Sequence, residues 1–130
     1  MPKLLLVEDD PSQSDPYRQL LEAQGYEVGI AAQGSRVVEI ALRFLPDLFI
    51  VDLNLDNGMD GYSGYSVLED LKQNDALKTV PIMVLTAVDL RDQDEIRALR
   101  LGADDVVRKS AEYGVVEARI TRLLKRTNRS

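Results

Sequence analysis

Short apolar runs alternate along this chain with segments in which apolar residues recur at helical spacing. The runs are too short for helices and are typical of strands that are buried on both faces of a sheet. They are LLLV at 4–7, VGIA at 28–31, LFIV at 48–51, IMVL at 82–85 and VV at 106–107. The helical sets are Leu20, Leu21 and Ala23; Val37, Val38, Ile40, Ala41, Leu42 and Leu45; Val67, Leu68 and Leu71; Ile96, Leu99 and Leu101; and Val115, Val116, Ala118, Ile120, Leu123 and Leu124. This alternation predicts a doubly wound α/β sheet with right-handed crossovers.

Glycine and proline predict where several helices begin and end. Gly25 and Gly102 follow the first and fourth helical sets, and Pro46 follows the second. Each is a typical helix stop. In a helix that began at Pro11, the ring of Pro16 would clash with the preceding turn at a cost of about 3 kcal/mol. We therefore expect the first helix to begin with Asp15 as its N-cap, or to kink at this point.

Composition and charge narrow the class of protein. With 130 residues, of which 45% are hydrophobic, the chain fits a single domain over residues 1–130. The absence of cysteine excludes disulfides and thiolate metal sites. No apolar run resembles a signal peptide or a membrane span, so we expect a cytoplasmic protein without membrane contact.

The net charge of -6 argues against direct nucleic-acid binding, because contact with phosphates needs a basic face. Basic residues do gather near the C-terminus, where cations commonly complement a helix dipole. They are Arg119, Arg122, Lys125, Arg126 and Arg129.

Polar residues follow four of the five predicted strands. They are Glu8, Asp9 and Asp10 after the first run, Asp52 after the third, Thr86 after the fourth and Lys109 after the fifth. In a doubly wound parallel sheet the carboxyl ends of the strands form the ligand-binding edge. Clustered carboxylates repel one another unless a cation joins them, and Mg²⁺ with oxygen ligands would do so. The set suits phosphoryl transfer, although each residue alone is compatible with a helix cap, a turn or a surface charge.

Four segments together resemble the receiver domains of response regulators, the phosphoaccepting half of two-component signalling and members of the CheY-like superfamily. The segments are LLLVEDD, LFIVDLNL, PIMVLTA and LGADDVVRK. The resemblance extends over about residues 3–126 and leaves 127–130 as a tail or the start of a linker. It implies a flavodoxin-like fold, a three-layer sandwich around a parallel five-stranded sheet with strand order 2-1-3-4-5.

The same resemblance implies roles for individual residues. Asp52 matches the phosphoacceptor and also contacts the metal. Asp9 matches the direct Mg²⁺ ligand, Glu8 its neighbour that acts mainly through metal-bound water, and Asn54 a ligand through its backbone carbonyl. Asp10 matches a variable position and is left out of the metal site.

Thr86 and Lys109 complete the implied site. Thr86 would hydrogen-bond a phosphoryl oxygen, and Lys109 would pair first with Asp52 and then with the phosphate. The chain contains no histidine, so the phosphohistidine donor must be a histidine kinase or a histidine phosphotransfer protein in trans. The resemblance implies a switch of conformation rather than an enzyme, because the only reactions are its own phosphorylation and dephosphorylation. Family members often form homodimers, and the sequence leaves this open.

Several positions depart from the family pattern. Asp56 stands in place of the usual proline, and the segment 56–63 contains an insertion of about four residues. The spacing from Thr86 to Lys109 is one residue longer than in the family pattern, and we place the extra residue in the segment AVDLRDQD after the fourth strand. Ser110 replaces the proline that follows the lysine, which rules out a cis prolyl bond there. Val106 replaces the aromatic residue three positions before the lysine, which puts the usual coupling of threonine to aromatic residue in doubt.

Two other functions stay open on the sequence alone. Asp52, Asn54 and Asp56 match the first, third and fifth positions of an EF-hand loop, but Asn57 and Ser63 fail at the sixth and twelfth, and an apolar strand precedes the motif. The other alternative is a receiver-like adaptor that binds a protein partner without phosphorylation, for which the altered Val106 and Ser110 are the reason.

Overall fold

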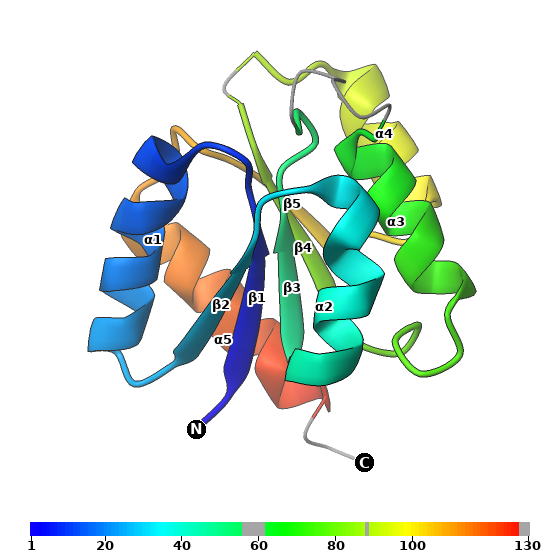
Figure 1. Cartoon of the computed structure of the whole chain (residues 1–130). Helices are drawn as coiled ribbons and strands as arrows, with labels where there is room; N and C mark the ends of the chain where they lie inside the picture. Colours follow the sequence, from blue (N-terminus) through cyan, green and yellow to red (C-terminus); the bar gives the residue numbers. More distant parts are fainter. Residues whose placement is uncertain (56–61, 88, 128–130) are drawn as a thin grey trace.

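Five parallel strands form one sheet in the order β2-β1-β3-β4-β5 (Figure 1). The computed structural model describes residues 1–55, 62–87 and 89–127. The strands are β1 (Lys3–Val7), β2 (Glu27–Ala31), β3 (Leu48–Val51), β4 (Ile82–Thr86) and β5 (Asp105–Arg108). The helices are α1 (Pro11–Ala23), α2 (Val37–Phe44), α3 (Gly64–Gln73), α4 (Asp92–Arg100) and α5 (Tyr113–Thr127), with a short 3-10 helix, η1 (Gly34–Arg36), before α2. The predicted flavodoxin-like α/β fold and strand order are confirmed.

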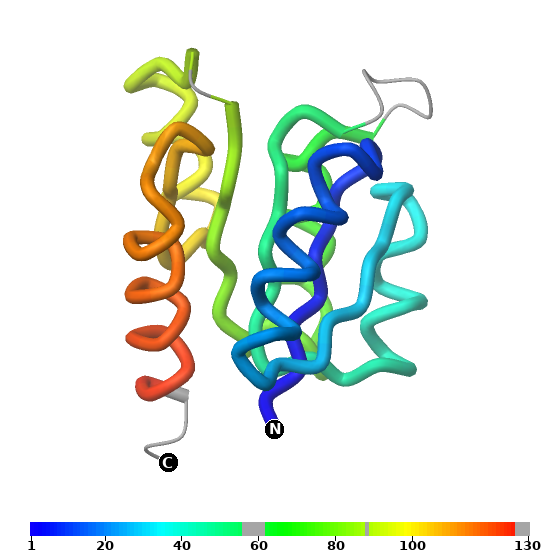
Figure 2. The backbone as a smooth tube through the Cα atoms, turned by 90° about the vertical axis from the view of Figure 1, so that its left-hand side faces the viewer, coloured from blue at the N-terminus to red at the C-terminus, as the bar shows by residue number. Residues whose placement is uncertain are grey.

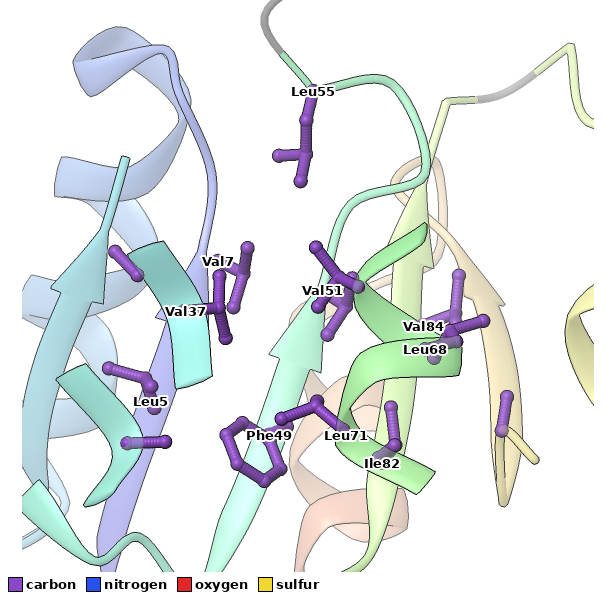
Figure 3. Packing of buried hydrophobic residues seen from close by; sticks show 14 of the residues in the cluster. Leu5, Val7, Val37, Phe49, Val51, Leu55, Leu68, Leu71, Ile82 and Val84 are labelled. Atoms are coloured by element: carbon purple, nitrogen blue, oxygen red, sulfur yellow. The ribbon is translucent and has the colours of Figure 1, made fainter. Parts of the chain in front are cut away.

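Helices cover both faces of the sheet, which is why the central strands are apolar at every position. In β1, Leu5 and Val7 face a cluster formed with α2, α3 and α4 (Figure 3). Leu4 and Leu6 face the opposite cluster, formed with α1 and α5. Figure 2 shows the first residues of β1 and the last turn of α5 at the same end of the molecule. The carboxyl ends of the strands therefore lie at the other end.

The first helix begins earlier than the sequence predicts. It starts at Pro11 and runs unbroken through Pro16, so the expected start at Asp15 is wrong. The cause is the stronger cap at Asp10, whose carboxylate accepts hydrogen bonds from the backbone N of Ser12 at 3.0 Å and from its hydroxyl at 2.7 Å. Pro11 then takes the first helical position, where a missing N–H costs nothing. Because Pro16 is exposed, the unpaired carbonyl one turn earlier can bond to water.

The other predicted helix ends are confirmed. Gly25 and Gly102 follow α1 and α4 with φ of 97° and 113°, a left-handed conformation that glycine adopts without steric cost. The second helix ends at Phe44, before Pro46. Among helices in the described parts of the chain, none is long and apolar enough to cross a membrane.

Gly64 fixes the start of α3 against the end of β3. Its backbone N donates to the carbonyl of Leu53 at 3.0 Å, so the chain returns to β3 after the segment that contains the insertion. A Cβ on Gly64 would lie 2.4 Å from the carbonyl oxygen of Asp52 and 2.4 Å from the Cα of Leu53. The predicted insertion at 56–63 lies mostly outside the described residues, which resume at Tyr62.

We predict that Gly64→Ala destabilises the protein by about 2 kcal/mol, because the new methyl group overlaps backbone that cannot rotate away. The matched control is Gly114→Ala, at the second residue of α5, where an added Cβ meets nothing within 4 Å. There alanine should stabilise the helix by about 0.5–1 kcal/mol. Urea denaturation followed by circular dichroism measures both changes, and equal effects of the two substitutions would contradict the close approach.

Candidate functional site

The parallel strands point their carboxyl ends to one edge of the sheet (Figure 1), and the polar residues predicted after them meet at this edge. In the parallel register Val7 pairs with Val51, which places Glu8 beside Asp52 on neighbouring strands. Thr86 is the last residue of β4, and its carbonyl accepts a 2.7 Å hydrogen bond from the backbone N of Lys109. The topology thus brings together groups that are distant in the sequence.

The carboxylate of Asp52 has hydrogen-bond donors on both of its oxygens. Oδ1 accepts from the hydroxyl of Thr86 at 3.0 Å and from the backbone N of Asn54 at 3.0 Å. Oδ2 accepts from Nζ of Lys109 at 2.8 Å. Asp52 is only 5% exposed, and a buried carboxylate needs such partners. The predicted trio of Asp52, Thr86 and Lys109 is therefore in mutual contact.

Lys109 also joins Asp52 to Glu8. Its Nζ donates to Oε1 of Glu8 at 2.7 Å. The pKa of Glu8 is raised to about 7, chiefly by burial; the neighbouring carboxylate of Asp52 also raises this pKa, and the hydrogen bond from Lys109 opposes both effects. Burial alone would lower the pKa of Lys109, but the bonds to Asp52 and Glu8 outweigh this and raise it. The ammonium is thus the cation between two carboxylates that would otherwise repel each other.

A polar cavity of about 210 Å³ opens beside these groups. Its lining consists of Glu8, Asp9, Asp10, Gln13, Asp52, Asn54, Ala87 and Lys109. Asp9 is partly buried, and Asn54 is exposed. All four residues predicted as metal ligands, Glu8, Asp9, Asp52 and Asn54, thus border one space.

The donor set of this cavity fits Mg²⁺. Carboxylate and carbonyl oxygens are the hard ligands that Mg²⁺ prefers, and the ion commonly keeps several waters in place of further protein ligands. In the described part of the chain, no group of three or more acidic side chains is close enough to hold a metal by itself.

The departures from the family pattern can be located. The turn after β5 contains no cis peptide bond in the described chain, and the backbone N of Ala111 donates to the carbonyl of Arg108 at 3.0 Å. Val106 is partly buried against the core cluster of α2, α3 and α4. The lengthened AVDLRDQD segment includes Val88, which lies outside the described residues. A strand, β3, precedes Asp52 where an EF-hand requires a helix, so the calcium-loop alternative is excluded.

Sequence reasoning missed Gln13. Its side-chain oxygen accepts a hydrogen bond from Nζ of Lys109, and its side chain lines the cavity. The sequence did contain a signal: Gln13 lies three residues after the N-cap of a helix that begins directly after the acidic residues that follow β1. The late helix start that we expected from Pro16 hid that signal.

Comparison with known proteins agrees with this geometry. The family model of the response regulator receiver domain matches residues 4–121. The DNA-binding dual master transcriptional regulator RpaA of a Synechocystis species is 34% identical over 129 residues, which are 99% of this chain and 52% of that protein. The chain spans about half the length of the curated relatives that it matches.

Solved structures give the same result. The signal receiver domain of a histidine kinase from Syntrophus aciditrophicus matches with a TM-score of 0.88 and 30% identity, over 100% of this chain and 95% of that one. The receiver domain of a sensor histidine kinase from Pseudomonas aeruginosa, with a magnesium ion coordinated in its active-site cleft, matches with a TM-score of 0.83 and 27% identity, over 95% and 98% of the two chains. This chain therefore belongs to the response regulator receiver domains of two-component, phosphorylation-based signalling.

Proposed function

We propose that Asp52 accepts a phosphoryl group from a histidine kinase or a histidine phosphotransfer protein, in a Mg²⁺-dependent reaction that switches the conformation of the domain. One observation supports this above the others. The two oxygens of the buried Asp52 carboxylate contact Thr86 and Lys109, at 3.0 Å and 2.8 Å, at the edge of an open polar cavity. These are the groups that phosphoryl transfer to a carboxylate requires.

The reaction forms one O–P bond and breaks one P–N bond. A carboxylate oxygen of Asp52 attacks phosphorus, and the electron pair of the P–N bond leaves with the imidazole of the donor. Charge spreads over the three equatorial oxygens in the transition state. Lys109 and Thr86 already donate to Asp52, so they need little reorganisation to donate to those oxygens. The protein acts mainly by positioning, and we propose no enzymatic activity beyond its own phosphorylation and dephosphorylation.

Glu8, Asp9, Asp52 and the backbone carbonyl of Asn54 are the residues that would hold Mg²⁺. When bound, the ion supplies positive charge beside the transferring phosphoryl group. The proposal is supported by the oxygen-rich cavity and by the magnesium ion in the active-site cleft of the Pseudomonas aeruginosa relative.

The donor must come from another protein, since the chain has no histidine. We propose a cytoplasmic signalling role in which this domain makes no direct contact with nucleic acid. A phosphoryl group adds charge and acceptor oxygens next to Thr86. Thr86 would then exchange its bond to Asp52 for one to the phosphoryl group and draw the segment after β4 with it. Homodimer formation is left to experiment.

Asp52 is the expected site of phosphorylation. With Mg²⁺ and acetyl phosphate, intact-protein mass spectrometry should detect one base-labile phosphoryl adduct, and Asp52→Asn should abolish it, because an amide cannot attack phosphorus in this way. Asp75→Asn is the matched control, since Asp75 is 95% exposed and pairs with Lys78 at the surface. An adduct that persists in Asp52→Asn would refute the assignment. A chain that forms no adduct even with a competent kinase would act as a non-phosphorylated adaptor instead.

Binding of Mg²⁺ can be tested without phosphorylation. Mg²⁺ should stabilise the folded protein, by about 2.7 kcal/mol when its concentration is about 100 times Kd, because the ion binds the native site and not the unfolded chain. Asp9→Asn should remove most of this stabilisation, whereas Asp75→Asn should retain it. Thermal unfolding with and without Mg²⁺ measures both. Equal stabilisation of the two variants would show that Mg²⁺ binds elsewhere.

A further inference from the structure

Gln13 gives the ammonium of Lys109 a third acceptor. The Nζ of Lys109 has three protons to donate. Oε1 of Glu8 accepts one at 2.7 Å, Oδ2 of Asp52 accepts another at 2.8 Å, and Oε1 of Gln13 accepts as well. Lys109 is the central group of the site, and Gln13 is its one uncharged partner among these three.

A simpler role for Gln13 would be to cap its own helix. The sequence DPSQ at 10–13 matches a capping box, in which the fourth residue accepts from the backbone N of the first. The structure has a different arrangement. The backbone N of Asp10 donates to Oε2 of Glu8, at 3.4 Å, while the side-chain oxygen of Gln13 is directed to Lys109. Gln13 is therefore engaged in the site and not in the cap.

The contact joins α1 to the turn after β5. The side chain of Asp10, the N-cap of α1, accepts from the hydroxyl and the backbone N of Ser12. An amide can accept at its oxygen. With that oxygen toward Lys109, Gln13 links the first turn of α1 to the ammonium.

An uncharged acceptor has a specific advantage at this position. Glu8 is a partner of Lys109 and also a candidate ligand of Mg²⁺, so a bound ion would compete with Lys109 for its carboxylate oxygens. An amide oxygen does not change charge with pH. The backbone N of Lys109 is held by the carbonyl of Thr86, whereas its ammonium is held by side-chain acceptors.

We propose that Gln13 is a positioning residue for Lys109, which keeps the ammonium directed at Asp52 while Glu8 turns to the metal. This inference rests on the proposed phosphorylation of Asp52. Gln13 does not touch the reacting atoms and acts only through Lys109. The substitution Gln13→Met preserves the length of the side chain and its place on α1 but removes the acceptor.

The first experiment measures phosphorylation by acetyl phosphate at saturating Mg²⁺. We expect Gln13→Met to slow it about tenfold, the effect of one charge-assisted hydrogen bond lost in the transition state. The control is Gln19→Met, at an exposed position of the same helix, which should react at the wild-type rate. A wild-type rate in Gln13→Met would overturn the inference and leave the proposed function intact. Failure of the unmodified protein to react with any donor would overturn both.

The second experiment needs neither metal nor phosphodonor. Unfolding by urea is measured for Gln13→Met, Lys109→Met and the double variant. In the presence of Lys109, Gln13→Met should raise the unfolding equilibrium constant about fivefold; in Lys109→Met it should change it less than twofold, because the partner is gone. A purely structural role of Gln13 in α1 would give equal effects in both backgrounds, and that result would overturn the inference.

Discussion

The ion pair of Lys109 with two buried carboxylates is the interaction on which this domain depends. Glu8 and Asp52 are 4% and 5% exposed, and each would be costly to bury with its charge unpaired. Lys109 lies 101 residues from Glu8 in the sequence, yet its Nζ reaches both carboxylates within 2.8 Å. The contact can form only after β1, β3 and β5 have taken their places in the sheet.

The apolar strands of the sheet place these charged residues next to one another. Because helices cover both faces, the residues of β3 are buried throughout, and the first polar side chain can appear only where the strand ends, at Asp52. The backbone N of Asp52 still bonds to the carbonyl of Val7, at 3.1 Å, so the hydrogen bonds of the sheet hold Asp52 beside the end of β1. Gly64 then allows α3 to begin against this backbone. The position of Asp52 is therefore set by the sheet and the packed core.

Most of this arrangement could be predicted from the sequence, because it depends on short apolar runs and on the order in which a parallel sheet connects them. Apolar runs identified all five strands, and a parallel sheet gathers the residues after its strands at one carboxyl edge, which located Asp52, Thr86 and Lys109 together. The start of α1 was mispredicted because the penalty for Pro16 was weighed without the cap that Asp10 and Ser12 form. The contact of Gln13 with Lys109 could not be predicted either. Whether a side chain turns to its own helix cap or to a lysine from another strand depends on tertiary geometry.

The residues around Asp52 and the residues that connect the site to the surface differ in how closely they follow the family pattern. The groups around Asp52 follow the family pattern, whereas Val106 is a small aliphatic residue packed on the core. The segment after Thr86 is joined to its surroundings by the packing of the partly buried Leu90 on that core and by polar contacts. Arg108 donates to the carbonyl of Leu90 at 3.1 Å.

On the other side of the same segment, α3 contacts α4 through an aromatic residue. The hydroxyl of Tyr65 donates to the carboxylate of Asp94 at 3.3 Å, and the guanidinium of Arg97 lies 4.0 Å from the centre of the Tyr65 ring. Partly buried hydrogen bonds of this kind contribute about 0.5–1.5 kcal/mol each, less than the burial of an aromatic ring. Any movement of Thr86 toward a phosphoryl group would therefore be opposed by several weak polar contacts and by the packing of Leu90. Such contacts can be exchanged one at a time, whereas a buried side chain must change its position in a single step.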